Sequence, residues 1–171
     1  MAKKVAKSEV KRVPPVTLRG VKLFWKNFEG RKGRFNQEGN RNFHIQLDMD
    51  VAKEMEADGW NIRWEDPREE GDSPTAHIKV KVSFDNYPPR ILMKIGDKIT
   101  PLGQDSVGIL DWSELMHVGV MLSPYQWDVN GKQGVNAYLK KLTVELDPDD
   151  LETAFLGGGG SPTDNDEDDE V

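Results

Sequence analysis

The side chains with the clearest chemical potential are the aromatic and basic residues of 118–146. Within this segment, Asn130 and Gly131 separate two extended runs. This pair is the strongest short-range signal for a type I′ hairpin turn, because both turn positions need a positive φ. If these two residues form the loop, Val129 pairs with Lys132 and the later pairs follow by alternation. One face of the hairpin then carries Trp127, Tyr125, Asn136, Tyr138 and Lys140.

The same register predicts four further pairs: Trp127 with Gly134, Tyr125 with Asn136, Ser123 with Tyr138, and Met121 with Lys140. The opposite face is apolar and is expected to face the core through Val120, Leu122, Val135, Ala137 and Leu139. Aromatic rings interleaved with cations suit a single-stranded nucleic acid, since every base has a π-face and every linkage a negative charge. The alternative is a hairpin buried on both faces, and a longer loop over 128–134 would exchange the two faces.

Two more basic and aromatic surfaces precede the hairpin. Residues 16–28 indicate one strand bent at Gly20, because a glycine inside a strand favours a bulge or bend. After the bend, Leu23 and Trp25 share the apolar face with Val21, and the other face carries Lys22, Phe24, Lys26 and Phe28. The segment 29–43 is a loop rich in Gly and Asn that holds Arg31, Lys32, Arg34, Phe35 and Arg41. A solvated hairpin loop without a ligand is the alternative for this segment.

Together these surfaces define the candidate site. We expect bases to stack on Trp127, Tyr125, Tyr138, Phe28 and Phe35. We expect phosphates to be neutralised by Lys22, Lys26, Arg31, Lys32, Arg34, Arg41, Lys140 and Lys141.

Charge is divided unevenly along the chain. The net charge is −7, yet all 23 Lys and Arg lie at or before Lys141, and ten of the 30 acids follow Leu146. Residues 1–146 therefore carry +3 and the remainder −10, so an acidic pI does not exclude a nucleic-acid partner. The end of the chain is a candidate partner-binding tail, formed by Asp164, Asp166, Glu167, Asp168, Asp169, Glu170 and Val171.

Composition and periodicity divide the chain into three parts. We predict a flexible basic N-terminal arm over 1–15, one folded domain over 16–152, and over 153–171 a glycine-rich linker followed by a disordered acidic tail. Alternating strands are predicted over 41–48, 60–64, 77–84 and 90–95, with helices over 50–58 and 104–116. In these strands His44, His77, Lys79 and Lys81 point outward. The pattern favours a mainly β fold, an OB-fold-like Greek-key barrel with one or two short helices, which the bent first strand closes.

Several classes of chemistry have no signal in the sequence. Cysteine is absent, which removes disulfides and thiolate catalysis and suits a reducing cytoplasm. The three histidines lack metal-ligand spacing, and no phosphate-binding loop or nucleophile elbow is present. Carboxylates at Asp48 and Asp50, or at Asp111 and Glu114, could hold magnesium in a nuclease, but they fit better as helix caps and turn residues. We therefore predict no enzyme, no metal and no cofactor.

The start has no secretory signal, and no apolar run is long enough to span a bilayer.

Three runs carry a resemblance to a known family: NFEGRKGRFNQEGNRNFHIQLD, EADGWNIRW and VMLSPYQWDVNGKQGVNAYLKKLTVEL. With the bent strand and the glycine tether to an acidic end, they resemble the OB-fold single-stranded DNA-binding proteins of tailed phages over roughly residues 16–152. The resemblance implies sequence-independent coating of ssDNA in phage replication or recombination, in the cytoplasm of a bacterial host.

The family likeness also bears on partners. The tail would recruit replication or recombination proteins and compete with DNA for the groove, and the chain is a candidate for homo-oligomerisation. One departure is Val171, where better-known tails end in an aromatic residue such as Phe. The alternative hypothesis is a protein-interaction or virion-associated module that uses the acidic tail and has no affinity for oligonucleotides.

Overall fold

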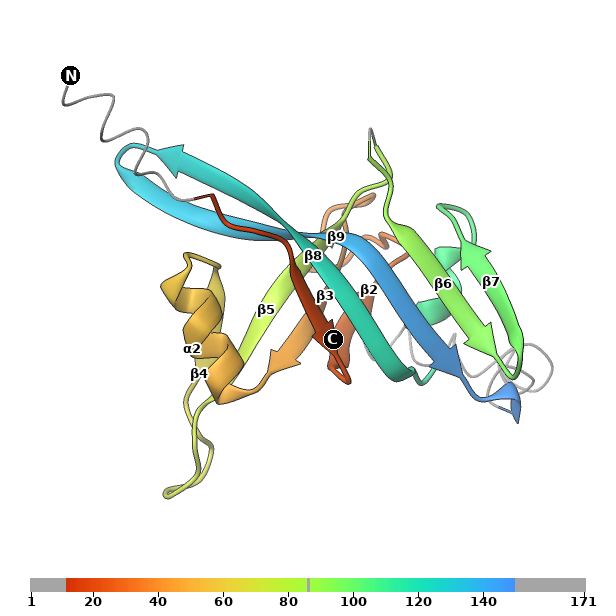
Figure 1. The fold of residues 1–171 in the computed structure, drawn as a ribbon, viewed down its shortest axis with the longest axis horizontal. Coiled ribbons are helices and arrows are strands. Elements are labelled where there is room, and N and C mark those ends of the chain that lie inside the picture. Colours follow the sequence, from red (N-terminus) through yellow and green to blue (C-terminus); the bar gives the residue numbers. More distant parts are fainter. Residues whose placement is uncertain (1–11, 86, 150–171) are drawn as a thin grey trace.

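The computed structural model describes residues 12–85 and 87–149. The predicted linker, the acidic tail and most of the predicted basic arm therefore lie outside the described residues. The elements of Figure 1 are β1 (Val16–Arg19), β2 (Lys22–Asn27), β3 (Arg41–Leu47), α2 (Met49–Ala57), β4 (Ile62–Glu65), β5 (Thr75–Val82), β6 (Arg90–Ile95), β7 (Lys98–Leu102), the 3₁₀ helix η1 (Val107–Asp111), β8 (Met116–Val129) and β9 (Lys132–Leu146).

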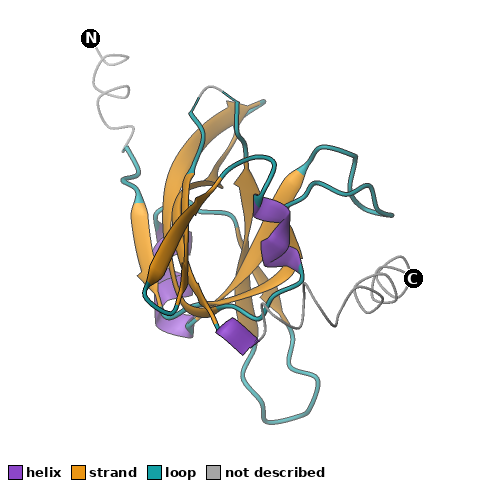
Figure 2. Cartoon of the chain, turned by 90° about the vertical axis from the view of Figure 1, so that its right-hand side faces the viewer, coloured by secondary structure: helices purple, strands orange, loops and turns teal. Residues whose placement is uncertain are grey.

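The sheet closes on itself through the bent first strand. The hydrogen-bonded order is β1-β8-β9-β5-β3-β2, so its two end strands are the two halves of one segment. The bend is at Gly20, whose φ of 66° places it in the left-handed region. There its N–H donates to the carbonyl of Val118 at 2.8 Å. The strands curl around a common interior in Figure 2, and the prediction of an OB-like, mainly β fold is confirmed.

The β8–β9 hairpin has the register that its turn predicts. Asn130 and Gly131 have φ values of 54° and 81°, and Val129 pairs with Lys132. Trp127 lies opposite Gly134, Tyr125 opposite Asn136 and Ser123 opposite Tyr138. The predicted partner of Met121 is wrong, because a bulge between Met121 and Leu122 makes Lys141 its partner in place of Lys140.

The core is formed by the inward residues of the alternating strands. The apolar hairpin face is buried as predicted, through Val120, Leu122, Val135, Ala137 and Leu139. From Lys141 to Leu146, one edge of β9 pairs with β8 and the other edge pairs in parallel with β6. The β6–β7 hairpin is therefore attached to the sheet through β9. Each fully buried aliphatic side chain contributes roughly 2 kcal/mol to folding. The core therefore holds the outer faces of β3, β5 and β9 in fixed register.

The helices are partly as predicted. The helix expected over 50–58 is α2, which buries Ala52 and Met55. The helix expected over 104–116 is wrong in extent, because only η1 is helical and β8 has already begun at Met116. Within residues 12–85 and 87–149, no helix has the length and apolar character needed to cross a bilayer.

Candidate nucleic-acid interface

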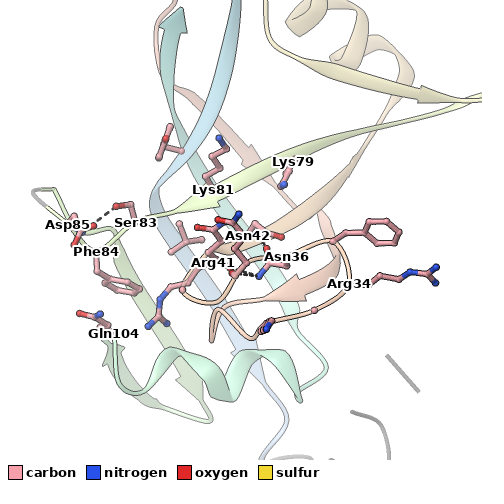
Figure 3. Close-up of a pocket in the computed structure, with 18 residues that line it drawn as sticks. Arg34, Asn36, Arg41, Asn42, Lys79, Lys81, Ser83, Phe84, Asp85 and Gln104 are labelled. Atoms are coloured by element: carbon pink, nitrogen blue, oxygen red, sulfur yellow. Dashed lines mark hydrogen bonds between the residues drawn. The ribbon is translucent and has the colours of Figure 1, made fainter. Parts of the chain in front are cut away.

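A groove of about 660 Å³ lies where the β2–β3 loop meets the outer face of β3 and β5 (Figure 3). Its walls also include the segment that follows β5 and one residue of β9, Tyr138. Five basic side chains line the groove against a single acid, Asp85. The basic residues are Lys32, Arg34, Arg41, Lys79 and Lys81. The groove is therefore cationic, although the chain as a whole is acidic.

Paired residues on the outer faces of β3, β5 and β9 line the groove. Lys81 of β5 pairs with Asn42 of β3 on one side and with Tyr138 of β9 on the other. Lys79 pairs with His44 on the same outer face. The pKa of Lys79 is lowered, first by burial and then by repulsion from Arg63 and Lys81. An anion beside these lysines would relieve that repulsion.

Lys79 and Lys81 are the functional candidates that sequence reasoning missed. Their outward orientation is predicted by the alternation of 77–84, and they are exposed or partly exposed as expected. The sequence does not show that the β2–β3 loop, more than 35 residues earlier, lies over them.

Side-chain amides hold the β2–β3 loop in shape. Asn27 Oδ1 accepts hydrogen bonds from the backbone N–H groups of Gly30 and Arg31, at 3.0 and 2.9 Å. Asn36 Nδ2 donates to the Arg31 carbonyl at 2.9 Å, and Asn42 Nδ2 donates to Asn36 Oδ1 at 3.0 Å. Because polar groups fix the loop internally, its apolar and charged side chains need not turn toward the core.

The loop presents its cations and its ring to solvent. Phe35 is 93% exposed, and the Arg34 guanidinium carbon lies 5.7 Å from the centre of its ring. Lys32 is also exposed. The exposed positions of these three residues are compatible with the expected interface.

The two other arginines of the site, Arg31 and Arg41, make contacts within the protein. The Arg41 Nη1 donates to the Phe28 carbonyl at 2.6 Å, and its guanidinium lies 5.1 Å from the centre of the Phe84 ring. The Arg31 guanidinium lies 4.7 Å from the centre of the Trp112 ring. Arg41 still lines the groove, as Figure 3 shows, whereas Arg31 is not among its lining residues.

Two predicted site residues are wrong, because Phe28 is a core residue and the partly buried Lys26 bonds to backbone carbonyls within the protein. Phe28 has no exposed surface and stacks on Phe43, with ring centres 4.9 Å apart. Lys26 donates from Nζ to the carbonyls of Leu110 and Ser113, at 2.7 and 2.6 Å. Burial lowers the pKa of Lys26, against the opposing effect of Asp111 and Glu114. Its ammonium group therefore anchors η1 to β2, and it is not available to a phosphate.

A bulge in β2 explains both corrections. The register between β2 and β3 shifts between Phe24 and Asn27, and Trp25 within the shift has a φ of 48°. Beyond the bulge the faces are exchanged, so Phe28 turns inward. Trp25 turns outward and is 63% exposed, although the sequence places it with Leu23 in the core.

Asp111 is also a structural residue. Its carboxylate accepts hydrogen bonds from the backbone N–H groups of Phe28 and Glu29, at 2.7 and 3.0 Å. Burial raises its pKa, while those two hydrogen bonds oppose the rise. Among the residues that the structure describes, no three His, Asp or Glu side chains form a metal-binding group.

The aromatic face of the hairpin adjoins the groove. The Tyr125 and Tyr138 rings lie 5.9 Å apart in an edge-on arrangement, and Tyr125 is 57% exposed. The Trp127 indole lies across Gly134, where an added Cβ would overlap Trp127 Cζ2. Lys140 and Lys141 are exposed at the β9 bulge, and Lys22 is exposed on β2. The hairpin therefore carries three rings outward, as predicted.

Known proteins resemble this chain in family and in fold. Residues 5–160 match the family described as "Putative phage ssDNA-binding domain". No curated protein matches the chain. The single-stranded DNA-binding protein from bacteriophage Enc34, solved in complex with ssDNA, is 11% identical with a TM-score of 0.51, covering 81% of this chain and 94% of that chain. Its C-terminal truncation is 10% identical with a TM-score of 0.50, covering 81% and 93%. At such identities the likeness is one of fold.

Proposed function

Because the chain belongs to the family of phage ssDNA-binding domains, we propose that it binds ssDNA along the cationic groove without strong sequence preference. The Enc34 protein was solved in complex with ssDNA and has a fold similar to that of this chain, which supports the proposal. The groove described above is where this chain would hold the strand.

The composition of the groove carries the proposal. Five cations against one carboxylate line it, although acids outnumber bases in the chain as a whole. Each phosphate neutralised by one of these cations releases a counterion, which favours binding in any sequence context. The cations proposed to contact phosphates are Lys22, Lys32, Arg34, Arg41, Lys79, Lys81, Lys140 and Lys141.

Rings that are exposed or partly exposed along the same surface supply the second interaction. Phe35 stands on the loop, and Tyr138, Tyr125 and Trp127 follow from the groove along the hairpin. Stacking on an unpaired base contributes about 1–3 kcal/mol per base and tolerates every sequence. Rings beside cations therefore suit single strands better than a duplex, whose bases are already stacked.

The role that follows is protection rather than catalysis. Coating would keep phage ssDNA single-stranded during replication or recombination in the host cytoplasm. The acidic tail would recruit protein partners and compete with ssDNA for the groove, since its charge is opposite to that of the groove.

The test is the salt dependence of oligo-dT binding by the full chain, followed by the polarisation of a labelled oligonucleotide. Contacts by the five groove cations contribute about −3.5 to the slope of log K against log salt, and contacts by all eight proposed cations would give about −5.6. Replacing Lys79 and Lys81 together with Ala should reduce its magnitude by roughly 1.4. Lys94→Ala with Lys98→Ala is the matched control, because both lysines are exposed on the β6–β7 hairpin and neither lines the groove.

Two results would contradict the proposal. Absence of binding at low salt would remove ssDNA as the ligand and would favour a protein-interaction module. Equal effects of the two lysine pairs would show that binding does not depend on this groove.

A further inference from the structure

Trp25 is a large apolar side chain that the backbone directs away from the core. In a regular strand it would follow Leu23 inward, but the β2 bulge turns it to the outer face, where it is 63% exposed. Its φ of 48° is rare for a residue with a bulky side chain. Both the exposure and the strain oppose folding. Bulges that redirect a side chain, and strained residues, occur preferentially at binding sites.

A buried histidine pair holds the indole in place. The Trp25 ring meets the rings of His44 and His77 edge-on, with centres 5.0 and 5.7 Å away. His44 and His77 are 6% and 5% exposed, and their Nδ1 atoms are 3.0 Å apart. The Glu65 carboxylate lies 3.2 Å from His77 Nε2.

Hydrogen bonds order this pair. A carboxylate only accepts, so His77 Nε2 donates to Glu65. A second hydrogen bond joins His44 Nδ1 to His77 Nδ1. A pair ordered in this way supports the Trp25 indole rigidly. A ring that only covered the histidines would itself be mostly buried, whereas Trp25 is 63% exposed.

The platform lies beside the groove and among cations. His44 pairs with Lys79, which lines the groove, and His77 pairs with Arg63. On β2, Lys22 pairs with Gln46, which in turn pairs with His77. A flat, exposed indole with cations on both sides suits one ligand chemistry, a planar base attached to a phosphate.

We infer that Trp25 is a nucleobase-stacking platform that extends the ssDNA path beyond Lys79. The inference rests on the proposed function and adds a subsite outside the groove, on β2. It places one base on the indole and its phosphate between Lys79 and Arg63.

The first test compares Trp25→Leu and Trp25→Phe in the full chain. Leu keeps apolar bulk without a π-face, so oligo-dT affinity should fall about tenfold, whereas Phe should stay within about threefold of the native protein. Trp64→Phe is the matched control, because the Trp64 indole bonds to Glu56 at 2.8 Å and does not line the groove. It should bind normally.

The second test uses the unmodified protein, so it does not depend on a variant folding. An oligo-dT with one 5-iodo-deoxyuridine is irradiated on the protein, and the cross-linked peptide is identified by mass spectrometry. A cross-link on Trp25, together with the loss in Trp25→Leu, supports the platform. Normal oligo-dT affinity with no cross-link on Trp25, and normal affinity of Trp25→Leu, would overturn the platform and leave the proposed function standing. No oligo-dT binding by the native protein would overturn both.

Discussion

Among single residues, the histidine pair shows how the outer face is organised. His44 and His77 point outward, as alternation predicts, yet they are buried because Phe24 and Trp25 cover them. Burial lowers the pKa of His44 from 6.5 to about 4, with further contributions from His77, Arg63 and Lys79. His44 is therefore neutral at physiological pH and adds no charge of its own to the surface.

This burial predicts a pH dependence of stability. Between pH 6.5 and about 4 the unfolded chain protonates His44 and the folded chain does not. The free energy of unfolding should therefore decrease as pH falls through this range, by an amount of the order of 2 kcal/mol from His44. Urea unfolding across the range measures it. His44→Gln should flatten this part of the profile. An unchanged profile in His44→Gln would contradict the assignment.

Among elements, the β8–β9 hairpin shows which features can be predicted locally. Asn130 and Gly131 determine the turn, and the turn determines the register and the exposed aromatic face. The two bulges are different, because they depend on how a strand fits its partners. The β9 bulge displaces the Met121 partner by one residue, and the β2 bulge exchanges Trp25 and Phe28 between faces. Alternation alone cannot find either bulge.

The candidate site also contains both residues that the local sequence predicts and residues whose positions depend on distant segments. Lys32, Arg34 and Phe35 were predictable, since a Gly- and Asn-rich loop exposes what it carries. Lys26 was not, because its partners are carbonyls more than 80 residues away. Lys79 and Lys81 were predictable as outward residues, but their place in the groove depends on the loop that lies over them.

The hairpin also predicts an effect of a single methyl group. Gly134 leaves room for the Trp127 indole, and a Cβ there would overlap it. Gly134→Ala should therefore displace the ring from the strand and weaken oligo-dT binding about tenfold, the loss of one stacked base. The melting temperature should change little, since the hairpin tip is exposed.

Gly103→Ala is the control for this substitution. Gly103 has open space at its Cβ position and lies outside the groove lining. It should bind as the native protein does. Native affinity in Gly134→Ala, in a folded protein, would exclude Trp127 in its present orientation from the interface.

In the whole molecule, basic and acidic residues occupy different parts of the chain, and the fold brings several basic residues together. The barrel gathers basic residues from the β2–β3 loop and from β5 into one groove, although these segments are far apart in sequence. Ten acids follow Leu146, outside the barrel strands. A tethered polyanion and a cationic groove in one chain attract each other, and screening by salt weakens that attraction.

This arrangement predicts that the tail competes with ssDNA. A chain ending at Leu156 lacks the six acids from Asp164 to Glu170 and should bind oligo-dT severalfold more tightly at low salt than the full chain. The difference should shrink between about 50 and 200 mM salt, because tail and DNA are bound through the same counterion-dependent contacts. A full-length variant with the six acids changed to Asn or Gln separates charge from length and should behave as the shortened chain does. If the neutral full-length tail still weakens binding, its length rather than its charge obstructs the groove. If all three proteins bind equally at low salt, the tail does not occupy the groove and serves only other partners.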